Sequence, residues 1–114
     1  MLTIYGIPNC DTSKKARRWL DAQGAEYSFH DVRADGIDRA TIESWLAQVD
    51  LKTLLNTRST TWRNLSDEQK ADVDNDSALS LMLEHPTLIK RPVLVHAGGV
   101  EVGFRDERYR LLFD

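Results

Sequence analysis

The sequence is poor in cysteine, because Cys10 is the only one among its 114 residues. A lone cysteine cannot close a disulfide within the chain, and small secreted domains that depend on disulfides normally carry an even number of cysteines. We therefore expect a reducing, cytoplasmic location. The chain also lacks cysteine and histidine at metal-binding spacing, since its histidines are scattered at His30, His85 and His96. We expect no bound metal and no bound cofactor.

Long apolar runs and an excess of positive charge are also missing. No apolar stretch is long enough to cross a bilayer, and the N-terminus has no basic region followed by an apolar segment. The net charge of −3 gives no overall basic field, so we expect neither a nucleic acid nor a membrane as a direct partner. The composition is that of a globular domain, with 41% hydrophobic and 29% charged residues. The length fits a single domain over residues 1–114, which we expect to be a monomer.

The first half of the chain alternates between strand-like and helix-like patterns. Short β-branched and apolar runs predict strands at Leu2–Tyr5 and Tyr27–Val32. Apolar residues at three- and four-residue steps predict helices from Asp11 to about Ala22 and over Ile37–Val49. The order is therefore βαβα.

The second half begins with a segment that shows no strand pattern. Over about residues 50–87 we expect a helical insert, in which Ser66 starts one short helix and Asp76 or Ser77 starts another. A hairpin of Pro92–His96 and Val100–Phe104 follows. A last helix is expected over Asp106–Phe113. Together the patterns predict an α/β fold with a mixed four-stranded sheet.

Cys10 lies between the first predicted strand and the first predicted helix. Unpaired N–H groups and the helix dipole at such a position favour the thiolate, and Lys14, four residues on, adds positive charge. The alternative is a small buried hydrophobic residue, which is the commoner role of a lone cysteine at an arbitrary position. The position at a helix start favours a reactive thiol.

The residue three positions after Cys10 is Ser13, where thioredoxin-type motifs have a second, resolving cysteine. A CxxS site can hold one partner through sulfur but cannot close its own disulfide. An external thiol must then complete any turnover, and glutathione is the expected one in a cytoplasm.

Arginines could form a second part of the site. Arg91 precedes Pro92 at the start of the third strand, where its fixed charge could stabilise a thiolate or hold an oxyanion. Arg58 lies in a polar stretch, and Arg105 follows the last strand. The alternative for each arginine is a solvated side chain in a weak surface ion pair.

These residues carry a family resemblance. The segments YGIPNCDTSKKARRWL, LLNTRSTTW, LEHPTLIKRPVLV and VGFR resemble the ArsC/Spx/YffB family, and most closely its small YffB-like branch. The resemblance covers essentially the whole chain. It implies a thioredoxin-like fold with the helical insert, with Cys10 as the nucleophile and Pro92 as the family's cis-proline.

Further implications concern the site and its partners. In arsenate reductases of this family the cysteine attacks arsenate, and three arginines hold the oxyanion. Glutathione and glutaredoxin then release the product and restore the free cysteine. Arg91 matches one of these arginines and Arg105 nearly matches another, whereas Asn56 aligns with the third and Arg58 lies two positions later. The histidine that precedes the cysteine in arsenate reductases has no counterpart here, and the longer C-terminal tail is missing. The binding residues expected around Cys10 are Asn9, Thr12, Ser13, Lys14, Arg58, Arg91, Pro92 and Arg105.

Three functions remain open at this point. The first is a glutathione-dependent thiol reductase, with glutathione and possibly glutaredoxin as partners. The second is an arsenate reductase coupled to the same thiols. The third is a non-enzymatic regulator that binds RNA polymerase as Spx does, although the CxxC switch used there is CxxS here.

Overall fold

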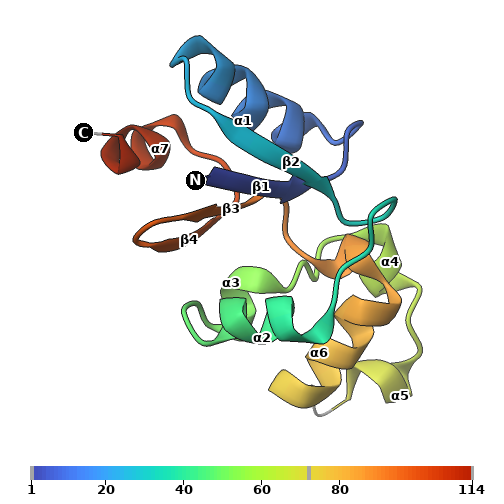
Figure 1. Cartoon of the computed structure of the whole chain (residues 1–114). Helices are drawn as coiled ribbons and strands as arrows, with labels where there is room; N and C mark the ends of the chain where they lie inside the picture. The colour runs from blue at the N-terminus through green and yellow to red at the C-terminus, as the bar shows by residue number, and fades with distance from the viewer. Residues whose placement is uncertain (1, 72, 114) are drawn as a thin grey trace. The chain divides into compact units, whose positions relative to one another are not determined.

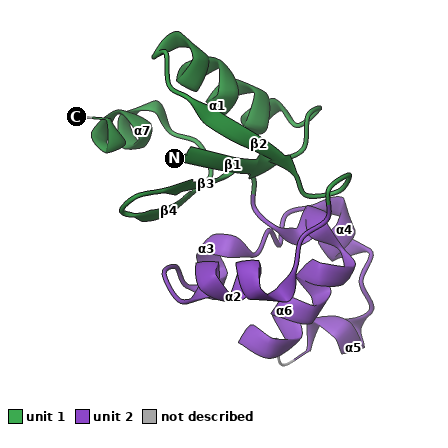
Figure 2. Cartoon of the chain, in the orientation of Figure 1, with its two compact units in different colours: residues 1–35, 91–114 green, residues 36–90 purple. Residues whose placement is uncertain are grey.

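The computed structural model describes residues 2–71 and 73–113 (Figure 1). The chain divides into two compact units, which Figure 2 shows in different colours. Unit 1 consists of residues 1–35 and 91–114, and unit 2 consists of residues 36–90. The chain therefore leaves unit 1 after its second strand and returns to it at Arg91.

Unit 1 contains a mixed four-stranded sheet in the order β2-β1-β3-β4. Strand β1 (Leu2–Gly6) pairs in parallel with β2 (Tyr27–Asp31) and antiparallel with β3 (Val93–His96). Strand β4 (Gly99–Val102) forms the hairpin with β3. The predicted sheet is confirmed. Its central strands come from opposite ends of the chain, with Tyr5 opposite Val93.

Two helices of unit 1 pack on one side of this sheet. They are α1 (Asp11–Ala22) and α7 (Asp106–Leu112). Ile4 and Leu94 are directly paired across β1 and β3, so their side chains share a face of the sheet. These two residues form one fully buried cluster with Ala16 and Leu20 of α1 and Tyr109 of α7. The spacing of Ala16 and Leu20, four residues apart, explains which stripe of α1 faces the core.

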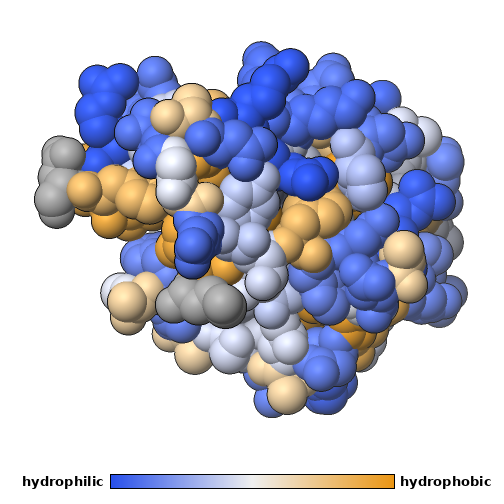
Figure 3. Space-filling model, turned by 45° about the horizontal axis from the view of Figure 1, so that its top comes forward, coloured by the Kyte–Doolittle hydropathy of each residue, from blue (hydrophilic) through white to orange (hydrophobic). Residues whose placement is uncertain are grey.

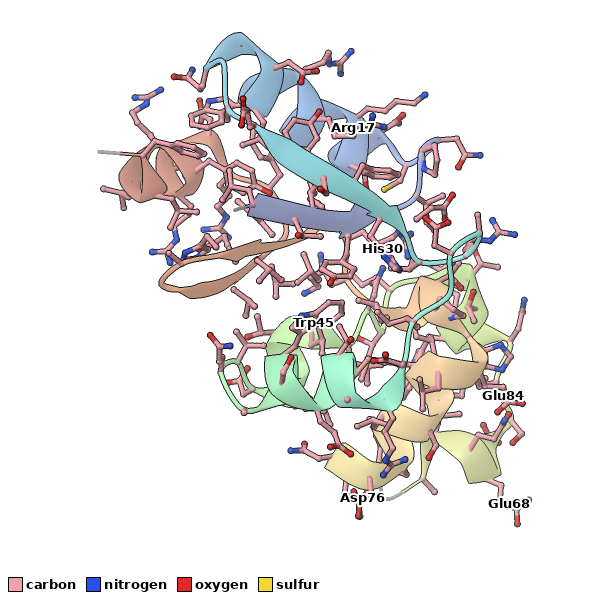
Figure 4. The ribbon with its side chains drawn as sticks, in the orientation of Figure 1. Arg17, His30, Trp45, Glu68, Asp76 and Glu84 are labelled. Carbon is pink, nitrogen blue, oxygen red and sulfur yellow. The ribbon has the colours of Figure 1, made fainter. Side chains whose placement is uncertain are left out.

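Aromatic and cationic contacts fix the flanks of unit 1. Arg17 of α1, labelled in Figure 4, lies with its guanidinium carbon 4.2 Å from the centroid of the Phe29 ring. The rings of Tyr5 and His30 lie 4.8 Å apart on neighbouring strands. Figure 3 shows a mostly hydrophilic surface that is interrupted by hydrophobic patches. The large hydrophobic side chains exposed in the described part of unit 1 belong to the C-terminal helix region, at Leu111 and Phe113.

Unit 2 is helical in its described residues. Its elements are α2 (Arg39–Leu46), α3 (Leu51–Leu54), α4 (Thr60–Arg63), α5 (Asp67–Lys70), α6 (Asn75–Glu84) and the 3-10 turn η1 (Pro86–Leu88). Trp45 of α2 and Met82 of α6 are among its fully buried side chains. An antiparallel bridge between Leu55 and Ile89 ties the end of α3 to the segment that leads back to unit 1.

The structure corrects several predicted bounds. Helix α2 covers Arg39–Leu46 only, because Asp38 caps its start by accepting the Thr41 N–H. Helix α6 starts at neither Asp76 nor Ser77: Asp74 is its N-cap and exchanges hydrogen bonds with Ser77 in a capping box. The helices predicted as an insert lie between α2 and β3 as expected. They share unit 2 with α2 itself.

Candidate thiol site

A tight turn brings Cys10 to the start of α1. The Ile7 carbonyl accepts the Cys10 N–H at 3.1 Å, which places Pro8 and Asn9 in the middle of the turn. Proline favours this position because its ring fixes the backbone angle that the turn needs. Cys10 is then the N-cap of α1, with an extended backbone, and its carbonyl accepts the Lys14 N–H at 2.9 Å. The half-buried thiol therefore lies beside the unpaired N–H groups of the first helical turn.

Ser13 lies in that first turn and is completely buried. Its hydroxyl has no hydrogen-bond partner of regular geometry, and the Cys10 side chain makes no regular capping bond to the helix. Both the hydroxyl and the N–H of Ser13 are nevertheless close enough to the sulfur to lower the pKa of the thiol. A thiolate is a stronger acceptor than a thiol. We interpret these donors as positioned for the ionised sulfur.

Competing effects set the pKa of Cys10. Burial is the largest of them and raises the pKa, because it disfavours the charged thiolate. The hydroxyl and the N–H of Ser13, followed by the guanidinium of Arg91, act in the opposite direction. Together they hold the pKa of the thiol below its ordinary value of 9.0. The sulfur is therefore ionised more readily than that of a free cysteine.

Arg91 reaches the thiol because of the strand pairing. It directly precedes Pro92 and β3, and β3 lies next to β1, which leads into the Cys10 turn. The Arg91–Pro92 peptide bond is cis and Pro92 is buried. The Pro92 carbonyl accepts the Gly103 N–H at 2.8 Å, just after β4. Gly103 has a φ of +80°, a conformation that glycine adopts without strain.

An open groove begins two residues after the thiol. It has a volume of about 600 Å³. Its walls come from α1 and from the segment that leads into α7: Thr12, Lys15, Arg18, Trp19, Phe104, Arg105, Asp106 and Glu107. The structure thus brings together Thr12 and Arg105, two of the residues predicted to bind a ligand around Cys10.

The other predicted site residues lie elsewhere. Asn9 borders a second depression, of about 470 Å³, together with Asp31 and Arg33. Lys14, expected to add positive charge near the thiol, is exposed on α1, and the guanidinium that lowers the thiol pKa is that of Arg91. Arg58 belongs to unit 2, where its N–H donates to the Asn56 side chain at 3.1 Å. Its role in binding stays a prediction.

Sequence reasoning missed much of the groove. The predicted site did not include Lys15, Arg18 or Trp19, although all three lie within the predicted helix from Asp11 to about Ala22. The available signal was the spacing of Thr12, Lys15 and Trp19, which places them along one stripe of a helix. That Phe104, Asp106 and Glu107 lie opposite this stripe depends on the packing of α7, which no local pattern specifies.

The described residues contain neither a cluster of metal ligands nor a candidate membrane-spanning helix. Over residues 2–71 and 73–113, no group of three or more His, Cys, Asp or Glu side chains is placed to hold a metal ion. In the same part of the chain, no helix combines the length and the apolar character that crossing a membrane requires.

Comparison with known proteins gives consistent matches over the whole chain. A model of the ArsC family matches residues 5–112. A solved structure named YFFB protein is 47% identical and covers 97% of each chain, with a TM-score of 0.95. That of an arsenate reductase (ArsC) related protein from Brucella melitensis is 45% identical and covers 99% of this chain and 94% of its own, with a TM-score of 0.77.

Curated relatives agree with these structures. An uncharacterised protein of Haemophilus influenzae is 44% identical, with 99% of each chain covered. More distant relatives include the global transcriptional regulator Spx of Streptococcus pneumoniae, which is 23% identical over 96% of this chain and 84% of its own. The matches confirm both the predicted resemblance and the thioredoxin-like fold.

Proposed function

The chain belongs to the ArsC family, and on that premise we propose that it is a glutathione-dependent thiol reductase with Cys10 as its single nucleophile. The observation that carries this proposal is the lowered pKa of the Cys10 thiol, caused by Ser13 and Arg91 against the opposing effect of burial. A thiolate, and not a thiol, attacks a disulfide. The site therefore favours the reactive, ionised form of the sulfur.

The reaction would proceed by two thiol–disulfide exchanges. The Cys10 thiolate attacks the glutathione sulfur of a mixed disulfide between glutathione and a substrate thiol. A new disulfide forms between Cys10 and glutathione, and the substrate leaves as a thiolate. A second glutathione thiolate then attacks this disulfide, which releases oxidised glutathione and restores the Cys10 thiolate. The electrons come from the two glutathione thiols that end as one disulfide.

The need for an external thiol follows from the residues around the nucleophile. Ser13 occupies the position of a resolving cysteine, and the sequence contains no second cysteine that could take over that role. A cysteine–glutathione disulfide on this chain can therefore be resolved only by another molecule. Glutathione, or glutaredoxin loaded from it, is the partner we propose, in a reducing cytoplasm.

A measurement of Cys10 reactivity tests this function. The rate of alkylation of the native protein should rise with pH around a midpoint below 9.0, and the same protein unfolded in urea should show the ordinary value. Oxidised glutathione should add one glutathione to Cys10, and free glutathione should remove it. A native midpoint at or above that of the unfolded chain would contradict the proposal. Cys10→Ser is the control for both experiments.

Arsenate reduction is the second candidate. It is favoured by the guanidinium of Arg91 beside the sulfur and by the 45% identity to a structure named an arsenate reductase related protein. Wild-type protein with glutathione and glutaredoxin should then form arsenite, and Cys10→Ser should not. No arsenite above the Cys10→Ser background would exclude arsenate as a substrate under these conditions.

The outcomes also separate an enzyme from a regulator. A protein that forms no glutathione adduct, but copurifies with RNA polymerase in both wild-type and Cys10→Ser form, would instead fit the regulator hypothesis. This outcome is worth testing because the relatives of this chain include the transcriptional regulator Spx.

A further inference from the structure

We propose that the groove between α1 and the start of α7 is a binding site for the peptide of glutathione, recognised by charges of both signs. Lys15 and Arg18 bind its carboxylates, and Glu107 binds its ammonium group. This inference rests on the proposed function, because it names how the same site selects its thiol co-substrate. The residues that it adds, Lys15, Arg18 and Glu107, are not among those that act on the pKa of the Cys10 thiol.

The charges along the groove point to a zwitterion. Its basic side chains are Lys15, Arg18 and Arg105, and its acidic side chains are Glu107 and Asp106, of which Asp106 is also ion-paired with Arg110 at 3.8 Å. The three basic groups attract the carboxylates of a ligand, and the acidic groups attract its ammonium group. Glutathione presents the complementary set, with two carboxylates and one ammonium. The groove therefore matches a zwitterionic peptide with an excess of negative charge.

The groove begins in the first turn of α1, which follows Cys10 directly, although Cys10 itself does not line it. Thr12, at one end, is two residues from the thiol, and Trp19 is seven residues further along α1. A helix rises about 1.5 Å per residue, so this stripe is about 10 Å long. A tripeptide in extended form has about the same length. The groove volume of about 600 Å³ also lies within the range of small-molecule sites.

The floor of the groove is held in place by one buried ring. Tyr109 is completely buried, and both Trp19 and Phe104 meet it edge to face, with ring centroids 5.6 Å and 4.8 Å away. Such pairs restrict the orientation of both rings. The methylene groups of a peptide can pack on these two rings while its charged ends face the rim. The floor is therefore formed before any ligand binds.

A ligand that cannot react tests binding separately from chemistry. S-methylglutathione carries the charges of glutathione but has no free thiol. Titrated into the wild-type protein, it should shift the NMR signals of the Trp19 indole N–H and of the Lys15 and Arg18 amides. Lys15→Ala and Arg18→Ala should each weaken its affinity about two- to fivefold, as expected for loss of one partly exposed ion pair. Lys52→Ala, which removes an exposed charge in unit 2, is the matched control.

Glu107→Gln separates two kinds of site. If Glu107 binds the ammonium, this variant weakens S-methylglutathione binding. If Glu107→Gln instead tightens S-methylglutathione binding, the groove is a plain anion site and the inference is wrong. Shifts confined to other residues, or no shift at millimolar ligand, would also overturn it.

The proposed function fails in a different way. That failure appears as an ordinary Cys10 pKa and no adduct with oxidised glutathione, whether or not S-methylglutathione occupies the groove. A normal adduct with no shift along the groove would instead remove the groove and leave the thiol chemistry in place.

Discussion

The Ser13 hydroxyl fills the space that a side chain on Gly6 would need. A Cβ at position 6 would lie 2.5 Å from Ser13 Oγ and 3.2 Å from Ser13 Cβ. The end of β1 and the first turn of α1 are therefore in direct contact at this point. Since Ser13 also acts on the sulfur, this contact links the backbone of the sheet to the chemistry of Cys10.

Gly6→Ala should disturb both stability and reactivity. The added methyl group must displace the buried Ser13 side chain, and overpacking of this kind typically costs about 1–3 kcal/mol of unfolding free energy. We expect a lower urea midpoint and, because Ser13 is displaced, a higher pKa for the Cys10 thiol. Gly98→Ala is the control, since a Cβ there would approach only the His96 ring, at 3.4 Å. Equal stability of the two variants would show that the Ser13 side chain moves aside at little cost in unfolding free energy.

Ser13→Ala should raise the pKa of Cys10 while leaving the fold intact. The change removes the hydroxyl that helps to stabilise the thiolate but keeps the backbone N–H and the Arg91 charge. At a pH below the wild-type midpoint, alkylation should slow by about tenfold or more, as expected for loss of one hydrogen bond to a charged group. The far-ultraviolet circular dichroism should not change. An unchanged alkylation rate would show that the hydroxyl makes no contribution.

Ser13→Cys should convert the site into one that resolves its own disulfide. N-cap and N3 side chains of a helix face each other, as they do in a capping box, so the two sulfurs would be close. Oxidation should then remove two hydrogen atoms from the intact protein, as mass spectrometry would detect. The glutathione adduct of this variant should decay without added thiol. Persistence of the adduct would place the two side chains too far apart to react.

Arg91→Ala should raise the thiol pKa more than Arg91→Lys does. Alanine removes both the hydrogen bond and the charge that Arg91 supplies, whereas lysine keeps the charge. The pH dependence of alkylation reports the difference. If the two variants behave alike, the fork geometry of the guanidinium matters more than its charge. If neither differs from wild type, Arg91 does not act on Cys10.

The lowered pKa also predicts how stability varies with pH. A thiol whose pKa is lower in the folded than in the unfolded protein releases its proton more readily in the folded state. Its ionisation therefore adds stability in full above about pH 9, and this contribution is lost as the pH falls through the folded-state pKa. The unfolding free energy of wild type, minus that of Cys10→Ser, should rise with pH from the alkylation midpoint of the folded protein to about pH 9. A flat or falling difference would mean that folding does not favour the thiolate.

Local patterns were sufficient for the elements around the thiol. The predicted bounds of α1 agree with the structure, because Gly6, Pro8 and Asn9 mark a turn and the apolar stripe of α1 is regular. The position of Cys10 at the helix start followed from the same pattern. The start of helix α6 was predicted wrongly because Asp74, Asp76 and Ser77 can all cap a helix, and the structure uses Asp74, which forms a capping box with Ser77.

Contacts between distant residues could not be predicted in the same way. The action of Arg91 on Cys10 depends on the pairing of β1 with β3, and sequence spacing alone does not specify which strands pair. The place of Arg91 before Pro92 at the start of the third strand suggested it, and the family resemblance agreed. The groove depends in addition on where α7 packs, so its acidic side chains did not enter the predicted site.

The pairing of β1 with β3 has a consequence for protein synthesis. Cys10 leaves the ribosome early, whereas Arg91 and β3 emerge only when most of the chain has been made. Until then the thiol lacks Arg91, one of the groups that lower its pKa. The cysteine of a nascent chain should therefore be less reactive. It reaches its full reactivity when the C-terminal segment of the chain completes the sheet. The alkylation rate of Cys10 would therefore distinguish chains in which β3 has joined the sheet from chains in which it has not.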